Sequence, residues 1–120
     1  MSYDVTIVDK SGEAIYVDEP HGLIGGTYSP TSRELWVNIT FNYAKIFNRE
    51  DVFGEGGIKN LIGMSVEEAL PIVTKAASVL KEDYAEDYWT PTEGNVKKSL
   101  MNLISLMKLA PNDGIIEIGY

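Results

Sequence analysis

The stretch "SVEEALPIVTKAASVLK", residues 65–81, decides the fold class. Its apolar side chains recur at steps of three and four residues, which is the spacing of one face of an α-helix. These residues are Val66, Leu70, Val73, Ala77 and Leu80. Ser65 is followed three residues later by Glu68, which matches a capping box at the first turn of a helix. We therefore predict an amphipathic helix over this stretch, with Pro71 inside it as a residue that can kink it.

A second helix is predicted over residues 92–109, on the C-terminal side of the first. Its apolar residues are again spaced for one helical face: Val96, Leu100, Leu103, Ile104 and Met107. Pro111 cannot continue this helix and so marks its end. Residues 115–120, "IIEIGY", alternate in the way of a strand and predict a final β-strand.

Toward the N-terminus the hydrophobic period changes to two, which is typical of strands. Residues 3–9 alternate apolar and polar side chains, and residues 14–18 form a second candidate strand. Gly12 lies between them, so the pair predicts a hairpin with its turn at this glycine. Residues 19–32 are rich in Gly and Pro and predict a loop, whereas residues 33–40, "RELWVNIT", predict a third strand.

Residues 41–51, "FNYAKIFNRED", leave two alternatives open, a continuation of the third strand or a short helix. Along the chain the predicted strands come first, the two helices follow and a strand closes the sequence. This order predicts an α+β fold in one domain spanning residues 1–120. We expect a single small sheet of about four strands, antiparallel or mixed, with two to three helices packed on one face.

Charge and composition bound the function. The 120 residues include 10 Lys and Arg against 18 Asp and Glu, a formal net charge of −8. The negative electrostatic field of such a chain repels phosphate backbones and anionic lipids, so we expect no direct binding to nucleic acids or membranes. We expect a basic protein as the partner. The chain has no Cys, which excludes disulfides and thiolate chemistry. With no signal-like N-terminus and no long apolar run, we expect a cytoplasmic protein.

No catalytic constellation is apparent. His21 is the single histidine of the sequence, so a histidine pair or a multi-histidine metal site cannot form within one chain. The glycine-rich residues 22–26 and 54–57 lack the Lys and Ser or Thr of a phosphate-binding loop. We therefore predict no catalytic residue, no metal site and no cofactor.

The stretch "KEDYAEDYWTPTEG", residues 81–94, mixes carboxylates with large aromatic residues. If the helix continued through it, like charges would lie one turn apart, which local stability does not explain. Two interpretations remain: the aromatics pack onto the sheet while the acids face water, or the stretch is a docking face. The candidate partner-binding residues are Glu82, Asp83, Tyr84, Glu86, Asp87, Tyr88, Trp89 and Glu93.

A second candidate site follows the strand at residues 35–42. Alternate positions there place polar side chains in one row, which either lines a small-ligand pocket or forms the wet face of an edge strand. Together with the loop at residues 21–32, this row is the alternative ligand-binding set: His21, Tyr28, Trp36, Asn38, Thr40 and Asn42. Its ligand would be a nucleotide or a metabolite, bound by a binding protein or a small enzyme.

The segments "VNITFNYAKIF", "GIKNLIGMSVEEALPIVTKAASVLKEDYAEDYW" and "LMNLISLMKLAPNDGIIEI" resemble a group of small uncharacterised proteins of bacteria and their phages. That group shares an Asn-bearing strand, a Glu-Ala helix after a glycine turn and a terminal Pro-then-strand ending. The resemblance implies no activity for any residue. By composition the chain is also similar in kind to phage inhibitors of host defence, including anti-CRISPR proteins.

These observations predict a non-enzymatic acidic protein that docks on a basic partner. One such partner is a nucleic-acid-binding host defence nuclease, whose site the carboxylates would occupy by imitating a phosphate backbone. The alternative is the small-ligand binding protein described above. A third hypothesis is an assembly domain that forms homo-oligomers through an apolar patch.

Overall fold

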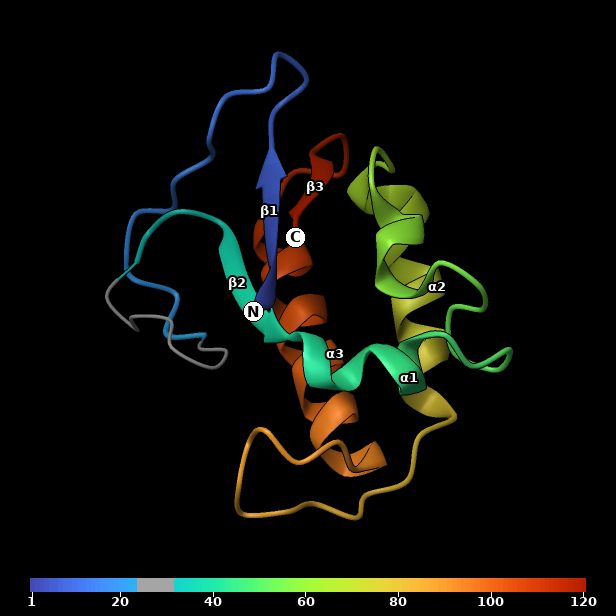
Figure 1. Cartoon of the computed structure of the whole chain (residues 1–120). Helices are drawn as coiled ribbons and strands as arrows, with labels where there is room; N and C mark the ends of the chain where they lie inside the picture. The colour runs from blue at the N-terminus through green and yellow to red at the C-terminus, as the bar shows by residue number, and fades with distance from the viewer. Residues whose placement is uncertain (24–31) are drawn as a thin grey trace.

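The computed structural model describes residues 1–23 and 32–120, and it has the α+β architecture expected from the sequence (Figure 1). Its strands are β1 (Ser2–Val8), β2 (Trp36–Thr40) and β3 (Ile115–Gly119). Its helices are η1 (Phe41–Tyr43), α1 (Ala44–Phe47), η2 (Gly57–Leu61), α2 (Val66–Ser78) and α3 (Glu93–Leu109). In Figure 1, α3 passes behind the strands and α2 lies beside it.

The described strands form an antiparallel sheet in the order β2-β1-β3, with the N-terminal strand in the centre. Val5 of β1 lies opposite Val37 of β2 and Ile118 of β3, so one apolar row crosses the sheet. The side chains of that face are buried in the core, whereas Asp4 and Glu117 on the other face are exposed. The two terminal strands, β1 and β3, are thus neighbours in the sheet.

The prediction of a second strand at residues 14–18 is wrong, so the described sheet has three strands and not four. The turn at Gly12 forms, with φ of 88°, but the chain beyond it makes isolated bridges rather than a ladder. Ala14 bridges to Val8, and Tyr16 bridges to Glu34. The physical reason is that β2 and β3 already occupy both edges of β1, which leaves no edge to which a hairpin partner can pair.

The outer edge of β3 is also paired, by the turn that precedes α2. The Gly63 amide donates to the Ile116 carbonyl at 2.8 Å, and the Ile116 amide donates to the Met64 carbonyl at 2.9 Å. Ser65 forms an isolated bridge with Ile115. This side of the sheet therefore ends against backbone rather than against solvent.

Both long helices begin where the sequence predicts. The Ser65 hydroxyl accepts from the Glu68 amide, and the Glu68 carboxylate accepts from the Ser65 amide, so the capping box is confirmed. α2 ends at Ser78 and not at residue 81. The Thr92 hydroxyl accepts from the Asn95 amide and caps α3. Residues 41–51 take the helical alternative, starting with η1 and α1.

The link between α2 and α3, residues 79–92, crosses the start of α3 at very short range. Gly94 is buried there, and a Cβ on it would lie 2.6 Å from the carbonyl carbon of Asp83 and from the amide nitrogen of Tyr84. These are backbone atoms, so a larger residue could fit only if the link moved away.

We expect Gly94→Ala to destabilise the protein by about 1–3 kcal/mol, since the added methyl group displaces the link. Inside a helix alanine is more favourable than glycine by up to about 1 kcal/mol. A net loss of stability would therefore show that the steric clash outweighs this gain. Gly119→Ala is the matched control, because its Cβ would meet its nearest neighbour at 3.8 Å. Chemical denaturation measures both, and equal stability of the two variants would contradict this packing.

Candidate functional site

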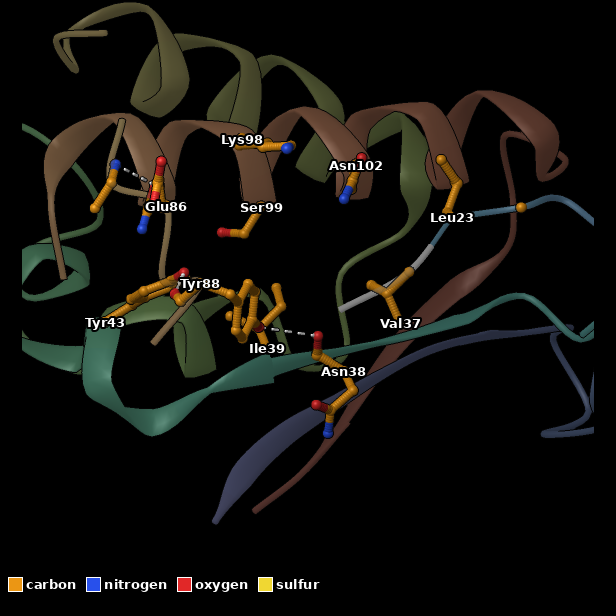
Figure 2. Close-up of a pocket in the computed structure, with 13 residues that line it drawn as sticks. Leu23, Val37, Asn38, Ile39, Tyr43, Glu86, Tyr88, Lys98, Ser99 and Asn102 are labelled. Carbon is orange, nitrogen blue, oxygen red and sulfur yellow. Dashed lines mark hydrogen bonds between the residues drawn. The ribbon is translucent and has the colours of Figure 1, made fainter. Parts of the chain in front are cut away.

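A cleft of about 430 Å³ lies between the edge strand β2 and helix α3. We name it the β2–α3 cleft; Figure 2 shows the residues that line it. Among the described residues, β2 contributes Val37, Asn38 and Ile39, and α3 contributes Asn95, Lys98, Ser99 and Asn102. Gly22, Leu23, Tyr43, Ala85, Glu86 and Tyr88 also line it. Three parts of the chain that are distant in sequence therefore enclose one space.

The periodicity of each element explains which side chains face the cleft. On β2 the alternation directs Val37 and Ile39 toward α3, and Figure 2 shows the Asn38 side chain on the opposite side of the strand. The Asn38 carboxamide donates there to the Asp4 carboxylate at 2.9 Å and to the Ser2 hydroxyl at 2.5 Å. The floor of the cleft is consequently apolar, and Asn38 reaches it only with its backbone.

Tyr88 lies at one end of the cleft and also meets the edge of β2 that is turned away from β1. Its hydroxyl accepts from the Thr40 amide at 3.1 Å and donates, over a long 3.5 Å, to the Asn38 carbonyl. The buried Tyr43 hydroxyl donates to the Tyr88 carbonyl, and the two rings are 5.6 Å apart. Burial, and then the neighbouring Tyr88 and Asp87, raise the pKa of Tyr43, so it remains a protonated donor.

Two opposite charges lie on the cleft wall, Glu86 from the link and Lys98 from α3 (Figure 2). Both side chains are exposed. The ion pairs among residues 1–23 and 32–120 are Lys10–Asp113, Arg49–Asp51, Arg49–Glu93 and Lys97–Glu82, and none includes Glu86 or Lys98. These two charges are therefore available to a ligand.

Except for Glu93, which begins α3, the predicted docking residues lie on a link that is not helical, so the charges are not stacked one turn apart. Several of the carboxylates instead form hydrogen bonds or ion pairs that hold the link in place. Asp83 accepts from the Gly94 amide at 2.8 Å, Asp87 accepts from the Trp89 amide at 3.0 Å, and Glu82 pairs with Lys97 at 3.7 Å. These acids thus have structural partners within the chain.

Glu93 and Asn95, at the start of α3, are the main anchors of the link. Glu93 accepts from the Lys81 amide at 2.9 Å and forms an ion pair with Arg49 at 3.0 Å. The Asn95 carboxamide accepts from the Ala85 amide and donates to the carbonyls of residues 87 and 90. Asn95 is buried, so it replaces the hydrogen bonds that water cannot supply to this part of the link.

The aromatic residues of the link divide into two groups. Tyr88 is partly buried against β2, as the packing interpretation requires. Tyr84 and Trp89 remain 56% and 42% exposed. The predicted face therefore retains two exposed aromatic rings, with Glu86 between them in sequence and without a partner in the described chain.

The alternative ligand set is only partly brought together. Trp36, Asn38 and Thr40 share the outer face of β2, away from the cleft, because they alternate with the core-facing residues. Asn42 lies in η1 instead, where its carboxamide donates to the Trp89 carbonyl at 3.0 Å. The strand thus borders a pocket, but not through this row of side chains.

His21 lies beside the cleft without lining it. Its Nδ1 accepts from the Leu23 amide at 3.1 Å, and its Nε2 lies 2.9 Å from the Glu34 carbonyl, which fixes the tautomer that carries the proton on Nε2. These contacts position Leu23, a residue of the cleft. Tyr28, the remaining member of the set, lies outside the described residues.

Sequence reasoning missed the α3 side of the cleft. Asn95, Ser99 and Asn102 are polar residues at helical spacing beside the apolar stripe, and this pattern is the signal that marks a second, partly buried face. In the part of the chain that the structure describes, no group of three or more His, Asp or Glu side chains could hold a metal ion. No described helix is both long and apolar enough to cross a membrane.

Glu93→Gln tests the attachment of the link. The hydrogen bond from the Lys81 amide, followed by that from Arg49, lowers the pKa of Glu93 below its ordinary value of 4.5. Because the folded-state pKa is the lower one, ionised Glu93 stabilises the fold above pH 4.5, and this contribution is lost as the pH falls through the folded-state pKa.

We therefore expect Glu93→Gln to lower the free energy of unfolding at pH 7 and to differ progressively less from the wild type below pH 4.5. Urea denaturation across this range measures the difference. Glu117→Gln, on the exposed face of β3, is the control. A wild-type advantage that is independent of pH would contradict the assignment.

No family model matches this chain, and neither a curated protein nor a solved structure matches it.

Proposed function

We propose that this protein is a non-catalytic binding protein whose ligand site is the β2–α3 cleft. The observation that carries the proposal is a cleft of about 430 Å³ with an apolar floor and unpaired charges on its wall. Pockets for small molecules have volumes of roughly 300–1,000 Å³, and they combine apolar walls with a few polar groups that orient the ligand.

The apolar floor supplies the attraction. Leu23, Val37 and Ile39 come from two separate segments and present aliphatic surface to the same space. Covering such surface stabilises a complex by roughly 25 cal/mol per Å² of apolar area removed from water. The charges of Glu86 and Lys98 then restrict the orientation of the ligand.

The polar groups of the cleft favour binding over turnover. The Ser99 hydroxyl donates to the Val96 carbonyl at 2.7 Å, so it is already engaged in its own helix. Both nitrogens of His21 lie within hydrogen-bond range of backbone groups. A nucleophile needs a base within hydrogen-bond reach, and the cleft brings no such pair together among the described side chains.

A thermal-shift screen of metabolites and nucleotides tests the proposal. A ligand at 100 times its Kd stabilises the folded state by about 2.7 kcal/mol, which raises Tm by several degrees. We expect Ser99→Phe to abolish the shift, because the ring fills the cleft. Ser105→Phe is the matched control, since Ser105 is exposed on the same helix.

Circular dichroism establishes that both phenylalanine variants are folded. A wild-type protein that no compound of the screen stabilises would contradict the proposal. So would a ligand that stabilises the folded Ser99→Phe variant as strongly as the wild type.

A second candidate function is docking on a basic protein partner through the exposed part of the link, Tyr84, Glu86 and Trp89. The observation in its favour is that two large aromatics remain exposed on a segment that Asn95 and Glu93 hold in one conformation. Aromatic anchors that are already ordered lose little entropy on binding. The net charge of −8 suits a partner that has a basic, nucleic-acid-binding surface. A host nuclease that is inhibited by a phage protein is one such partner.

Charge and aromatic substitutions test this docking. We expect Tyr84→Ala/Trp89→Ala to weaken binding of a co-purifying partner by at least about ten-fold, the usual effect of losing anchor residues. Glu82→Lys/Glu86→Lys should slow association and reduce its dependence on salt. Asp83 and Asp87 are left intact because they fasten the link.

The partner is identified by affinity capture from the host at low and at high salt, and its Kd is then measured by titration. Glu55→Lys/Glu117→Lys provides the same change of net charge at other exposed positions. If this control weakens binding as much as the Glu82 and Glu86 pair, a specific docking face is contradicted.

A further inference from the structure

The unusual feature of the β2–α3 cleft is a pair of opposite charges that do not satisfy each other. Glu86 and Lys98 line the same cleft, yet they form no ion pair with one another or with any described residue. Figure 2 shows both residues on the α3 side of the cleft, across from β2. Each charge would gain from a counter-charge that the chain itself does not provide.

The rest of the chain makes this arrangement informative. With 10 cationic side chains against 18 anionic ones, cations are scarce, and nearby ones are already used. Lys97, next to Lys98 in sequence, pairs with Glu82, and Arg49 pairs with both Asp51 and Glu93. Lys98 is one of several cations without an ion pair among the described residues, and it is the one that lines the cleft.

We propose that the β2–α3 cleft selects zwitterions, molecules that carry a free ammonium and a free carboxylate on an apolar body: an apolar amino acid or a short apolar peptide. This inference rests on the proposed ligand-binding function of the cleft. The carboxylate binds Lys98, the ammonium binds Glu86, and the apolar side chain covers Leu23, Val37 and Ile39.

Electrostatics at the cleft disfavours ligands that carry only one of the two charges. A monocarboxylate would gain Lys98 but would meet repulsion from Glu86 and from the net charge of −8. An amine would gain Glu86 but would meet repulsion from Lys98. A molecule with both charges converts each repulsion into an attraction, so selectivity comes from unfavourable contacts with the wrong ligands as well as favourable ones with the right ligand.

The surface beside Lys98 bears on the length of the ligand. Lys98 also borders a shallow second hollow with Tyr84 and Met101, which are 56% and 48% exposed. An amino acid would occupy only the cleft. A dipeptide or tripeptide would extend past Lys98 and place a second apolar side chain on Tyr84 and Met101.

Calorimetric titration with three matched probes tests the inference: L-phenylalanine, 3-phenylpropionate, which lacks the ammonium, and 2-phenylethylamine, which lacks the carboxylate. The dipeptide L-leucyl-L-phenylalanine tests length. We expect one of the two zwitterions to bind the wild type about three- to ten-fold more tightly than either singly charged probe, as partly exposed ion pairs allow. The advantage should decrease as ionic strength rises.

Two charge-neutralising variants assign the two ends of the ligand. Lys98→Gln should remove the advantage of the zwitterion over 2-phenylethylamine, and Glu86→Gln should remove its advantage over 3-phenylpropionate. Lys108→Gln, an exposed lysine of the same helix outside the cleft, should leave all the affinities unchanged.

Equal affinity for zwitterionic and singly charged probes, or an advantage that both variants retain, would overturn the inference. If such probes or other compounds still bind wild type and fail with Ser99→Phe, the ligand-binding function stands while zwitterion selection falls. If neither the four probes nor the screen yields a ligand, both proposals fall together.

Discussion

The attachment of residues 79–92 to the first turn of α3 is the constraint on which the site depends. Glu93 and Asn95 bind backbone groups along this link, and Gly94 lets the link approach to a distance at which a methyl group would collide. This attachment places Tyr88 against β2 and Glu86 on the cleft wall. Without it the cleft would lose one of its sides, so a local network of hydrogen bonds determines the shape of the candidate binding site.

The sequence allowed the regular elements to be predicted wherever local pattern and tertiary packing agree. The capping box at Ser65 and the apolar stripes of both long helices are local signals, and the structure confirms them. Residues 14–18 have the same alternation as a strand, but strand pairing is a competition for edges. β1 has two edges, and the distant β2 and β3 occupy both, which no local pattern could show.

The candidate site was harder to predict because it is built from contacts between remote segments. The sequence left open whether the strand at residues 35–42 lines a pocket or forms the wet face of an edge strand. The side chains of β2 that face the cleft are the apolar ones, Val37 and Ile39, and not the polar row. The acidic link was recognised as unusual, but its carboxylates serve mostly as acceptors for backbone amides. A carboxylate that replaces a missing backbone partner cannot be told from a solvated one by composition alone.

The two sides of the sheet end in different ways. Beyond β3 the neighbour is main chain from residues 63–65, whereas at the outer edge of β2 the Tyr88 phenol, within the described part of the chain, meets the Thr40 amide and the Asn38 carbonyl. An uncovered strand edge is a template for lateral growth into fibrils. By engaging these two backbone groups, the Tyr88 phenol hinders lateral strand pairing at this edge and at the same time forms a wall of the candidate site.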